Sequence, residues 1–194
     1  MQKEVPYIMI AAALLIGAGI FWFTGSQNSQ QLQSTQTSQN ENPITSNTMK
    51  IFSTAFNHNG NIPAKYTCDG ENISPPLEIS SVPPMAKSIV LIVDDPDAQA
   101  GTWVHWVLFN IPPKTAQIAE NSMPEGATEG TTSFGKPGWG GPCPPSGAHH
   151  YQFKIYALDT VLQIPASSTK ADLEKEMANH ILDHGQTIGL YQRN

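Results

Sequence analysis

The first group of residues that could carry chemistry is the acidic run Asp94 to Asp97 (DDPD), followed a few positions later by His105. The run ends one apolar segment and His105 lies within the next, so carboxylates and an imidazole meet if the two segments are neighbouring strands. A nearby carboxylate raises the pKa of histidine and favours the cationic ring. Each part also has an ordinary structural interpretation, because Asp95 and Asp97 around Pro96 are common turn residues and a lone His on an apolar strand is often a core residue.

The second group lies in the segment Gly135 to Tyr151 (GKPGWGGPCPPSGAHHY), which is too rich in Gly and Pro to form regular structure before its last residues. Gly allows the backbone to approach a ligand closely, and Pro keeps a loop rigid. Side chains alternate along a strand, so His149 and Tyr151 share one face while His150 points to the other. We therefore expect this loop and the group around His105 to form one pocket.

Imidazole rings, a Tyr hydroxyl and backbone N–H groups suit a small anion, such as a phosphate monoester or a phospholipid head group. A carboxylate in the same pocket could accept hydrogen bonds from an ammonium group of that ligand. The His and Asp residues could instead hold a divalent metal, although their spacing matches no compact motif such as HExxH. Nucleophilic catalysis has less support, because there is no G-x-S-x-G elbow and Gly135-Lys136-Pro137 lacks the Ser or Thr of a phosphate-binding loop.

The elements that must position these residues are mostly strands. Apolar or alternating segments predict three clear strands and two weaker ones, and there is no βαβ rhythm and no internal repeat. We therefore predict a mainly β fold, an antiparallel β-sandwich with small peripheral helices. The clear strands are Ser88 to Val93, Trp103 to Ile111 and Tyr151 to Leu158, and the weaker ones are Leu77 to Val82 and Thr187 to Tyr191.

One helix is predicted near the C-terminus. Thr169 is a suitable N-cap with Asp172 three residues later, and Gly185 would end the segment. Apolar residues recur at helical spacing in between: Leu173, Met177 and Ile181.

The N-terminal part has a different character. Val5 to Phe23 is apolar throughout, and at about 1.5 Å per residue a helix of that length nearly matches the ~30 Å hydrocarbon layer. Its length and its terminal aromatic residues favour a retained membrane anchor at residues 1–23 over a signal segment that is cleaved to give a secreted protein. Residues 24–48 are rich in Ser, Thr, Gln and Asn, and this composition predicts a flexible linker. The globular domain is then 49–194, and we expect it to be extracytoplasmic.

The net charge of the chain limits the classes of molecule that it could bind. The chain has 10 Lys and Arg against 16 Asp and Glu, a net charge of -6, and charged residues make up only 13% of it. This balance argues against broad electrostatic binding of nucleic acid.

Three long blocks of the sequence resemble the phosphatidylethanolamine-binding protein family, in its prokaryotic Raf-kinase-inhibitor-like branch. Two of them contain the groups described above, and the similarity extends over essentially all of Lys50 to Asn194. The blocks are IPAKYTCDGENISPPLEI (62–79), DDPDAQAGTWVHWVLFNIP (94–112) and GWGGPCPPSGAHHYQFKIYALD (138–159).

The resemblance implies a β-sandwich with a large central sheet and an anion pocket. It also implies lipid or anion binding, or inhibition of a kinase or protease, with no common catalytic reaction and no cofactor. We therefore expect a non-enzymatic binding protein; a protein inhibitor with a vestigial pocket is an alternative, and a metal-dependent hydrolase is a weaker one. Gln99 replaces a Pro that the family commonly has. The positions that the resemblance assigns to the pocket are Asp95, Pro96, Asp97, His105, Pro142, Gly147, His149 and Tyr151.

The two cysteines, Cys68 and Cys143, both fall in loops of the matched blocks. An even number of cysteines in an exported domain allows one disulfide. Two small buried thiols are equally compatible with the sequence.

Overall fold

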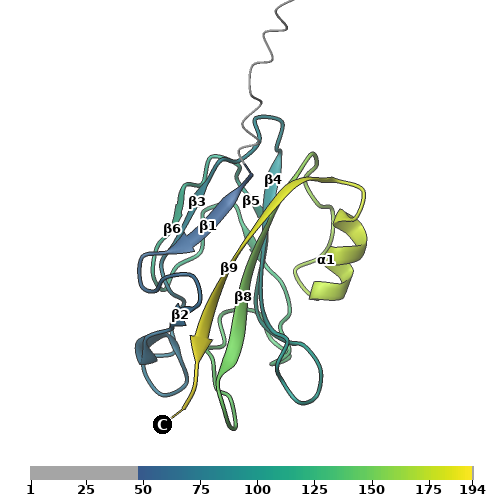
Figure 1. Cartoon of the computed structure of the whole chain (residues 1–194). Coiled ribbons are helices and arrows are strands. Elements are labelled where there is room, and N and C mark those ends of the chain that lie inside the picture. The colour runs from purple at the N-terminus through teal and green to yellow at the C-terminus, as the bar shows by residue number, and fades with distance from the viewer. Residues whose placement is uncertain (1–47, 194) are drawn as a thin grey trace, which may run out of the picture. The chain divides into compact units, whose positions relative to one another are not determined.

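The computed structural model describes residues 48–193, and two β-sheets form the framework of this region (Figure 1). In the six-stranded central sheet all neighbouring strands are antiparallel except the pair β2 and β9. The central sheet has the order β2 (Gly60–Asn61), β9 (Ile181–Tyr191), β8 (His149–Leu158), β4 (Ser88–Asp95), β5 (Trp103–Ile111) and β7 (Thr128–Glu129). The small sheet has the order β1 (Lys50–Ser53), β3 (Leu77–Ser80) and β6 (Gln117–Ile118).

Strand β4 is buried along its whole length because both of its faces are covered. Its residues Ile89, Leu91 and Val93 pack into the core shared with the small sheet. The alternate residues Val90 and Ile92 pack on the opposite face, together with helix α1 (Lys170–Met177). Figure 1 shows α1 on one side of the central sheet and the small sheet on the other. The prediction of a mainly β fold is confirmed.

Helix α1 is shorter than its predicted length. Thr169 forms a capping box with Asp172, as its sequence indicates. The prediction that the helix continues through Ile181 to Gly185 is wrong, because these residues belong to β9, which pairs with β8. A Cβ at Gly185 would collide with the carbonyl oxygen of Met49, so this glycine serves close packing between chain segments and not a helix end.

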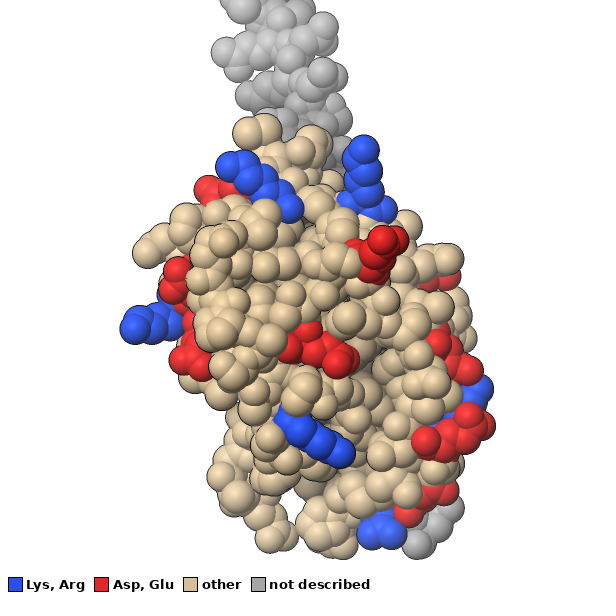
Figure 2. Space-filling view, turned by 180° about the vertical axis from the view of Figure 1, so that it is seen from behind, with Lys and Arg blue, Asp and Glu red and all other residues tan. Residues whose placement is uncertain are grey.

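The predicted anchor at 1–23 and the predicted linker at 24–48, apart from Thr48, lie outside the described residues. Within residues 48–193 no helix is long and apolar enough to cross a membrane. Met49 is buried, and its backbone N–H donates to Oδ2 of Asp183 at 2.8 Å. The face in Figure 2 has acidic and basic side chains interspersed among large areas that carry neither.

Candidate functional site

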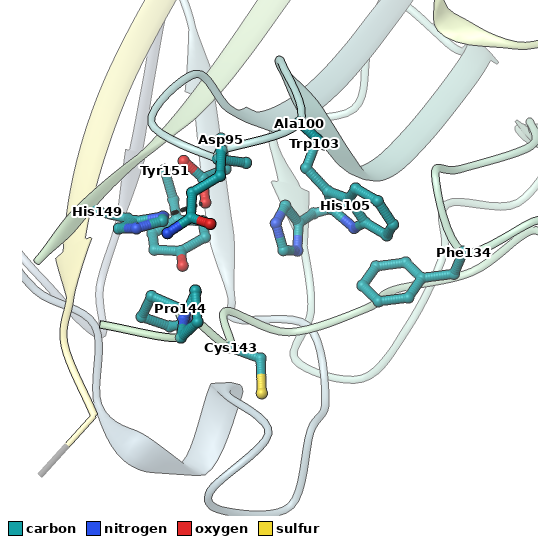
Figure 3. A pocket seen from close by; sticks show the side chains of 12 residues that line it. Asp95, Ala100, Trp103, His105, Phe134, Cys143, Pro144, His149 and Tyr151 are labelled. Carbon is teal, nitrogen blue, oxygen red and sulfur yellow. Dashed lines mark hydrogen bonds and ion pairs between the residues drawn. The ribbon is translucent and has the colours of Figure 1, made fainter. Parts of the chain in front are cut away.

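A cavity of about 310 Å³ lies where β4 ends and where β5 and β8 begin, beside the Gly- and Pro-rich loop. Of the eight residues predicted to form an anion pocket, four line it: Asp95, His105, His149 and Tyr151. Figure 3 shows Asp95, His149 and Tyr151 gathered on one side of the cavity and His105 on the other.

The pair of Asp95 and His149 forms the polar side of the cavity. Nδ1 of His149 lies 2.7 Å from Oδ2 of Asp95, and both residues are buried. Because a carboxylate can only accept, Nδ1 carries the hydrogen and the ring keeps its Nε2 atom for other contacts. The second oxygen of Asp95 accepts the backbone N–H of Asp97 at 2.9 Å. The carboxylate is therefore held by two protein donors, and it orients the imidazole.

A β-bulge in β5 brings His105 into the cavity. Val93 of β4 pairs with Trp106 and Asp94 pairs with Val104, so His105 has no partner on β4. This extra residue interrupts the alternation of β5: Trp106 packs between the two sheets, whereas Val104 packs on the α1 side. A bulge is a common means of redirecting a side chain next to a functional site.

His105 is also fixed by the loop. Its Nδ1 donates to the carbonyl oxygen of Gly140 at 2.5 Å, and the N–H of Gly140 donates to the His105 carbonyl oxygen at 3.0 Å. Burial lowers the pKa of His105, with the hydrogen bond to Gly140 acting against that effect. The ring is therefore neutral near pH ~7, with its hydrogen on Nδ1 and a lone pair on Nε2.

Tyr151 is the fourth predicted residue that lines the cavity. Its ring lies edge-on to His105, with centroids 5.2 Å apart, and stacks near His149 at 6.5 Å. Burial raises the pKa of the Tyr151 phenol, and the negative charge of Asp95 adds to the rise. The phenol thus keeps its proton and remains a hydrogen-bond donor.

The rest of the cavity wall is apolar except for Gln99, and it was not predicted. Trp103 and Phe134 pack edge to face, with ring centroids 5.5 Å apart, and Phe134 also contacts His105. The spacing of Trp103 two residues before His105 could have indicated that both line one site, whereas nothing in the sequence marks Phe134. The remaining apolar lining comes from the loops: Ala98, Ala100, Pro144 and Pro145.

The other four predicted residues do not line the cavity. The Asp97 carboxylate binds the backbone N–H of His150 at 2.8 Å and its Nδ1 at 2.7 Å, and the side-chain bond contributes most to lowering the pKa of Asp97. Pro96 is exposed, and Gly147 has a φ of 72°, which glycine adopts readily. The carbonyl oxygen of Pro142 accepts the N–H of Cys68 at 3.1 Å. Asp97, Gly147 and Pro142 thus shape the loops around the cavity.

Cys68 and Cys143 are joined in a disulfide, with their Cα atoms 5.4 Å apart. Both residues are exposed, so the alternative of two buried thiols does not describe this structure. Cys143 lines the cavity, and the disulfide connects its wall to the segment around Tyr66. A further bond to the same segment runs from Nε1 of Trp139 to the carbonyl oxygen of Tyr66, at 3.2 Å.

The cavity does not contain a cluster of metal ligands. Among residues 48–193, no group of three or more His, Cys, Asp or Glu side chains is arranged to hold a metal ion. The polar side chains that line the cavity are one carboxylate, two imidazoles, one phenol and the amide of Gln99, beside an otherwise apolar wall. This is the arrangement of a β-sandwich protein with a small-ligand pocket at one end of its central sheet.

Comparison with known proteins identifies which β-sandwich this is. The profile of the family described as phosphatidylethanolamine-binding protein matches residues 52–192. A UPF0098 protein of Methanothermobacter thermautotrophicus is 49% identical over 150 residues, which cover 75% of this chain and 99% of that protein. The chain therefore belongs to the phosphatidylethanolamine-binding protein family, and the resemblance noted in the sequence is confirmed.

Two solved structures support the same conclusion. A Chlamydia trachomatis protein described as a homologue of the phosphatidylethanolamine-binding protein is 41% identical, with a TM-score of 0.74 and coverage of 77% of this chain and 100% of that one. Escherichia coli YbcL, described as a member of the mammalian family, is 29% identical, with a TM-score of 0.71 and coverage of 76% and 99%. Membership in this family supports a binding function.

Proposed function

We propose that the cavity binds the phosphate group of a small molecule or of a phospholipid head group and carries out no reaction on it. The observation that carries the proposal is the convergence of His105, His149 and Tyr151 on one cavity in which Nδ1 of each imidazole is already engaged by the protein. Each ring therefore has only its Nε2 atom for a ligand. The family description, phosphatidylethanolamine-binding protein, agrees with a phosphate ligand.

Binding of a phosphate dianion should take up a proton. A neutral imidazole that donates through Nδ1 can only accept through Nε2, which would repel an anionic oxygen. Protonation turns Nε2–H into a charge-assisted donor. Tyr151 supplies a neutral donor without any change of charge.

The absence of catalysis is part of the proposal, and two observations support it. The Tyr151 phenol is a weak nucleophile because burial raises its pKa. Both oxygens of Asp95 accept hydrogen bonds from the protein, which leaves the carboxylate poorly placed to attack a ligand. We further propose that the apolar run 5–23 anchors the chain, so that the domain works outside the cytoplasm near a lipid surface.

The test is thermal unfolding of the full-length chain in nonionic detergent with inorganic phosphate, phosphoethanolamine or ethanolamine. Phosphate and phosphoethanolamine should raise the melting temperature saturably, and ethanolamine alone should raise it much less. Tyr151→Phe removes one donor at nearly constant shape, so it should weaken the protection by roughly 5-fold to 10-fold. No protection of the wild type at millimolar phosphate would reject the proposal.

Binding of a protein partner at the opening of this cavity is the second candidate function, and one observation favours it. Phe134 is 43% exposed although its ring lines the cavity, so it presents apolar surface to an approaching molecule. A kinase or a protease could be the target. Inhibition that is lost in Phe134→Ser while phosphate binding is retained would separate this role from ligand binding.

A further inference from the structure

A second cavity, of about 330 Å³, contains a carboxylate without a cationic partner. Its lining includes Glu129, Trp106 and Trp139, together with Asn72, Asn121 and Met123. We propose that this cavity binds a small organic ammonium cation. The site shares no lining residue with the phosphate pocket, so the proposal does not depend on the function proposed above.

Glu129 is held in a fixed position by a buried donor. Nε1 of Trp106 donates to Oε1 of Glu129 at 3.0 Å, and Trp106 is only 1% exposed. None of the ion pairs found among residues 48–193 includes Glu129. Beside its other oxygen lies Gly138, where even a Cβ atom would remain 3.9 Å away. The carboxylate is therefore preorganised and has room for a positively charged group.

The half-buried indole ring of Trp139 gives the cavity an electron-rich wall, whereas Trp106 is almost fully buried and serves to hold Glu129. Trp139 stacks on Phe153, with centroids 6.2 Å apart, and lies edge to face with Trp106 at 5.8 Å. Its Nε1 donates to the carbonyl oxygen of Tyr66, so both indole N–H groups are used inside the protein. Aromatic rings beside a carboxylate attract organic cations through cation–π and charge interactions.

The chemistry of the lining disfavours other ligands. No Lys, Arg or His lines the cavity, so an anion would find no cationic side chain there. A hard divalent metal ion needs several oxygen ligands, and Glu129 is the one carboxylate in the lining. The amide oxygen of Asn72 already accepts the N–H of Gly141 at 2.8 Å. An ammonium group with attached carbon atoms fits both the charge and the rings.

Isothermal titration of the full-length chain with choline, in nonionic detergent, tests the proposal. Choline should bind saturably in the millimolar range, whereas dimethylbutanol, its neutral carbon isostere, should bind much more weakly. Glu129→Gln should weaken choline binding roughly tenfold. The glutamine amide oxygen can still accept from Trp106, so this variant should keep the fold.

Glu125→Gln is the matched control, because Glu125 is exposed, lies outside the lining and loses the same charge. It should bind choline as the wild type does. Equal binding of choline and its isostere would overturn the proposal, as would equal choline affinity in the two glutamine variants or an absence of choline binding. Glu129→Gln should leave protection by inorganic phosphate unchanged, so failure of one site is distinguishable from failure of the other.

Discussion

His149 and Asp95 are 54 positions apart in the sequence, yet their Nδ1 and Oδ2 atoms lie 2.7 Å apart in a buried contact. The contact joins the end of β4 to the start of β8, two strands that are neighbours in the central sheet. It gives the cavity its fixed polar side. The stability of the domain and the properties of its pocket are therefore coupled through one buried hydrogen bond.

Removing one member of this pair should be costly. His149→Ala leaves the Asp95 carboxylate buried without the N–H group that His149 donates to it, and removing one member of a buried pair typically destabilises a protein by about 3 kcal/mol. The double variant Asp95→Asn, His149→Ala should recover part of that loss, since the buried charge is then absent. Urea unfolding of the three proteins measures these differences.

The neighbouring pair of His150 and Asp97 provides the control. It has the same Nδ1 to Oδ2 distance of 2.7 Å, but its side chains are 52% and 41% exposed. Exposed pairs contribute little, so His150→Ala should cost less than about 1 kcal/mol. Equal losses for His149→Ala and His150→Ala would contradict the special role of the buried pair.

Anion affinity should depend on pH. Sulfate keeps its charge between about pH 6 and pH 8, whereas an imidazole must take up a proton to donate to it. Sulfate should therefore protect the domain more strongly at about pH 6 than at about pH 8. Thermal unfolding with and without sulfate, in buffers that do not bind, gives the comparison. Protection that is independent of pH would show that the imidazoles do not protonate on binding.

Without ligand, the free energy of unfolding should depend on pH in part through His105. Burial lowers its pKa in the folded state, so below an unfolded pKa of about 6.5 the unfolded chain binds a proton that the folded chain does not. Stability then falls as pH decreases through that window, by up to about 1.4 kcal/mol per pH unit. The fall should stop below the folded pKa.

His105→Gln should remove this part of the slope while the amide still donates to Gly140. Urea unfolding at several pH values compares the two proteins. Parallel stability curves for wild type and variant would count against a neutral, buried His105.

The disulfide should stabilise the domain and the pocket together. Cys68 and Cys143 are separated by 75 positions, and closing a loop of that length lowers the entropy of the unfolded chain by an amount worth about 4 kcal/mol. Cys143→Ser should therefore lower the melting temperature and weaken phosphate protection, because Cys143 is in the cavity wall. Alkylation and mass spectrometry of unreduced protein should detect no free thiol; two alkylated thiols would exclude the bridge.

The N-terminal anchor is testable by fractionation. Full-length protein should remain with membranes after a carbonate wash, and N-terminal sequencing should find residues 1–23 still attached. A chain that begins near residue 24, recovered from the soluble fraction, would show that the segment is a cleaved signal.

The sequence is enough to predict the strands around the pocket but not the contacts inside it. Segments such as 88–93 and 103–111 are apolar on both faces because both faces of the central sheet are covered. Four polar members of the site could be found because their chemistry or the strand alternation marks them: Asp95, His105, His149 and Tyr151. The contact of Asp95 with His149 depends on strand order, which no local pattern contains. Phe134 and Glu129 lie in sites formed only by tertiary packing.

The end of α1 is a second place where the local sequence does not predict the structure. Ile181 continues the helical spacing of Leu173 and Met177, but pairing of β9 with β8 determines its conformation. A long-range strand contact thus overrides a local preference.

The extra residue in β5 places two consecutive rings, His105 and Trp106, in different cavities. In a strand with strict alternation, neighbouring side chains point to opposite faces, and only one of these rings could face the space between the sheets. A deletion that restored regular pairing would therefore remove a ring from one of the two cavities. The two cavities therefore depend on the same irregularity in β5, and its loss would alter at least one of them.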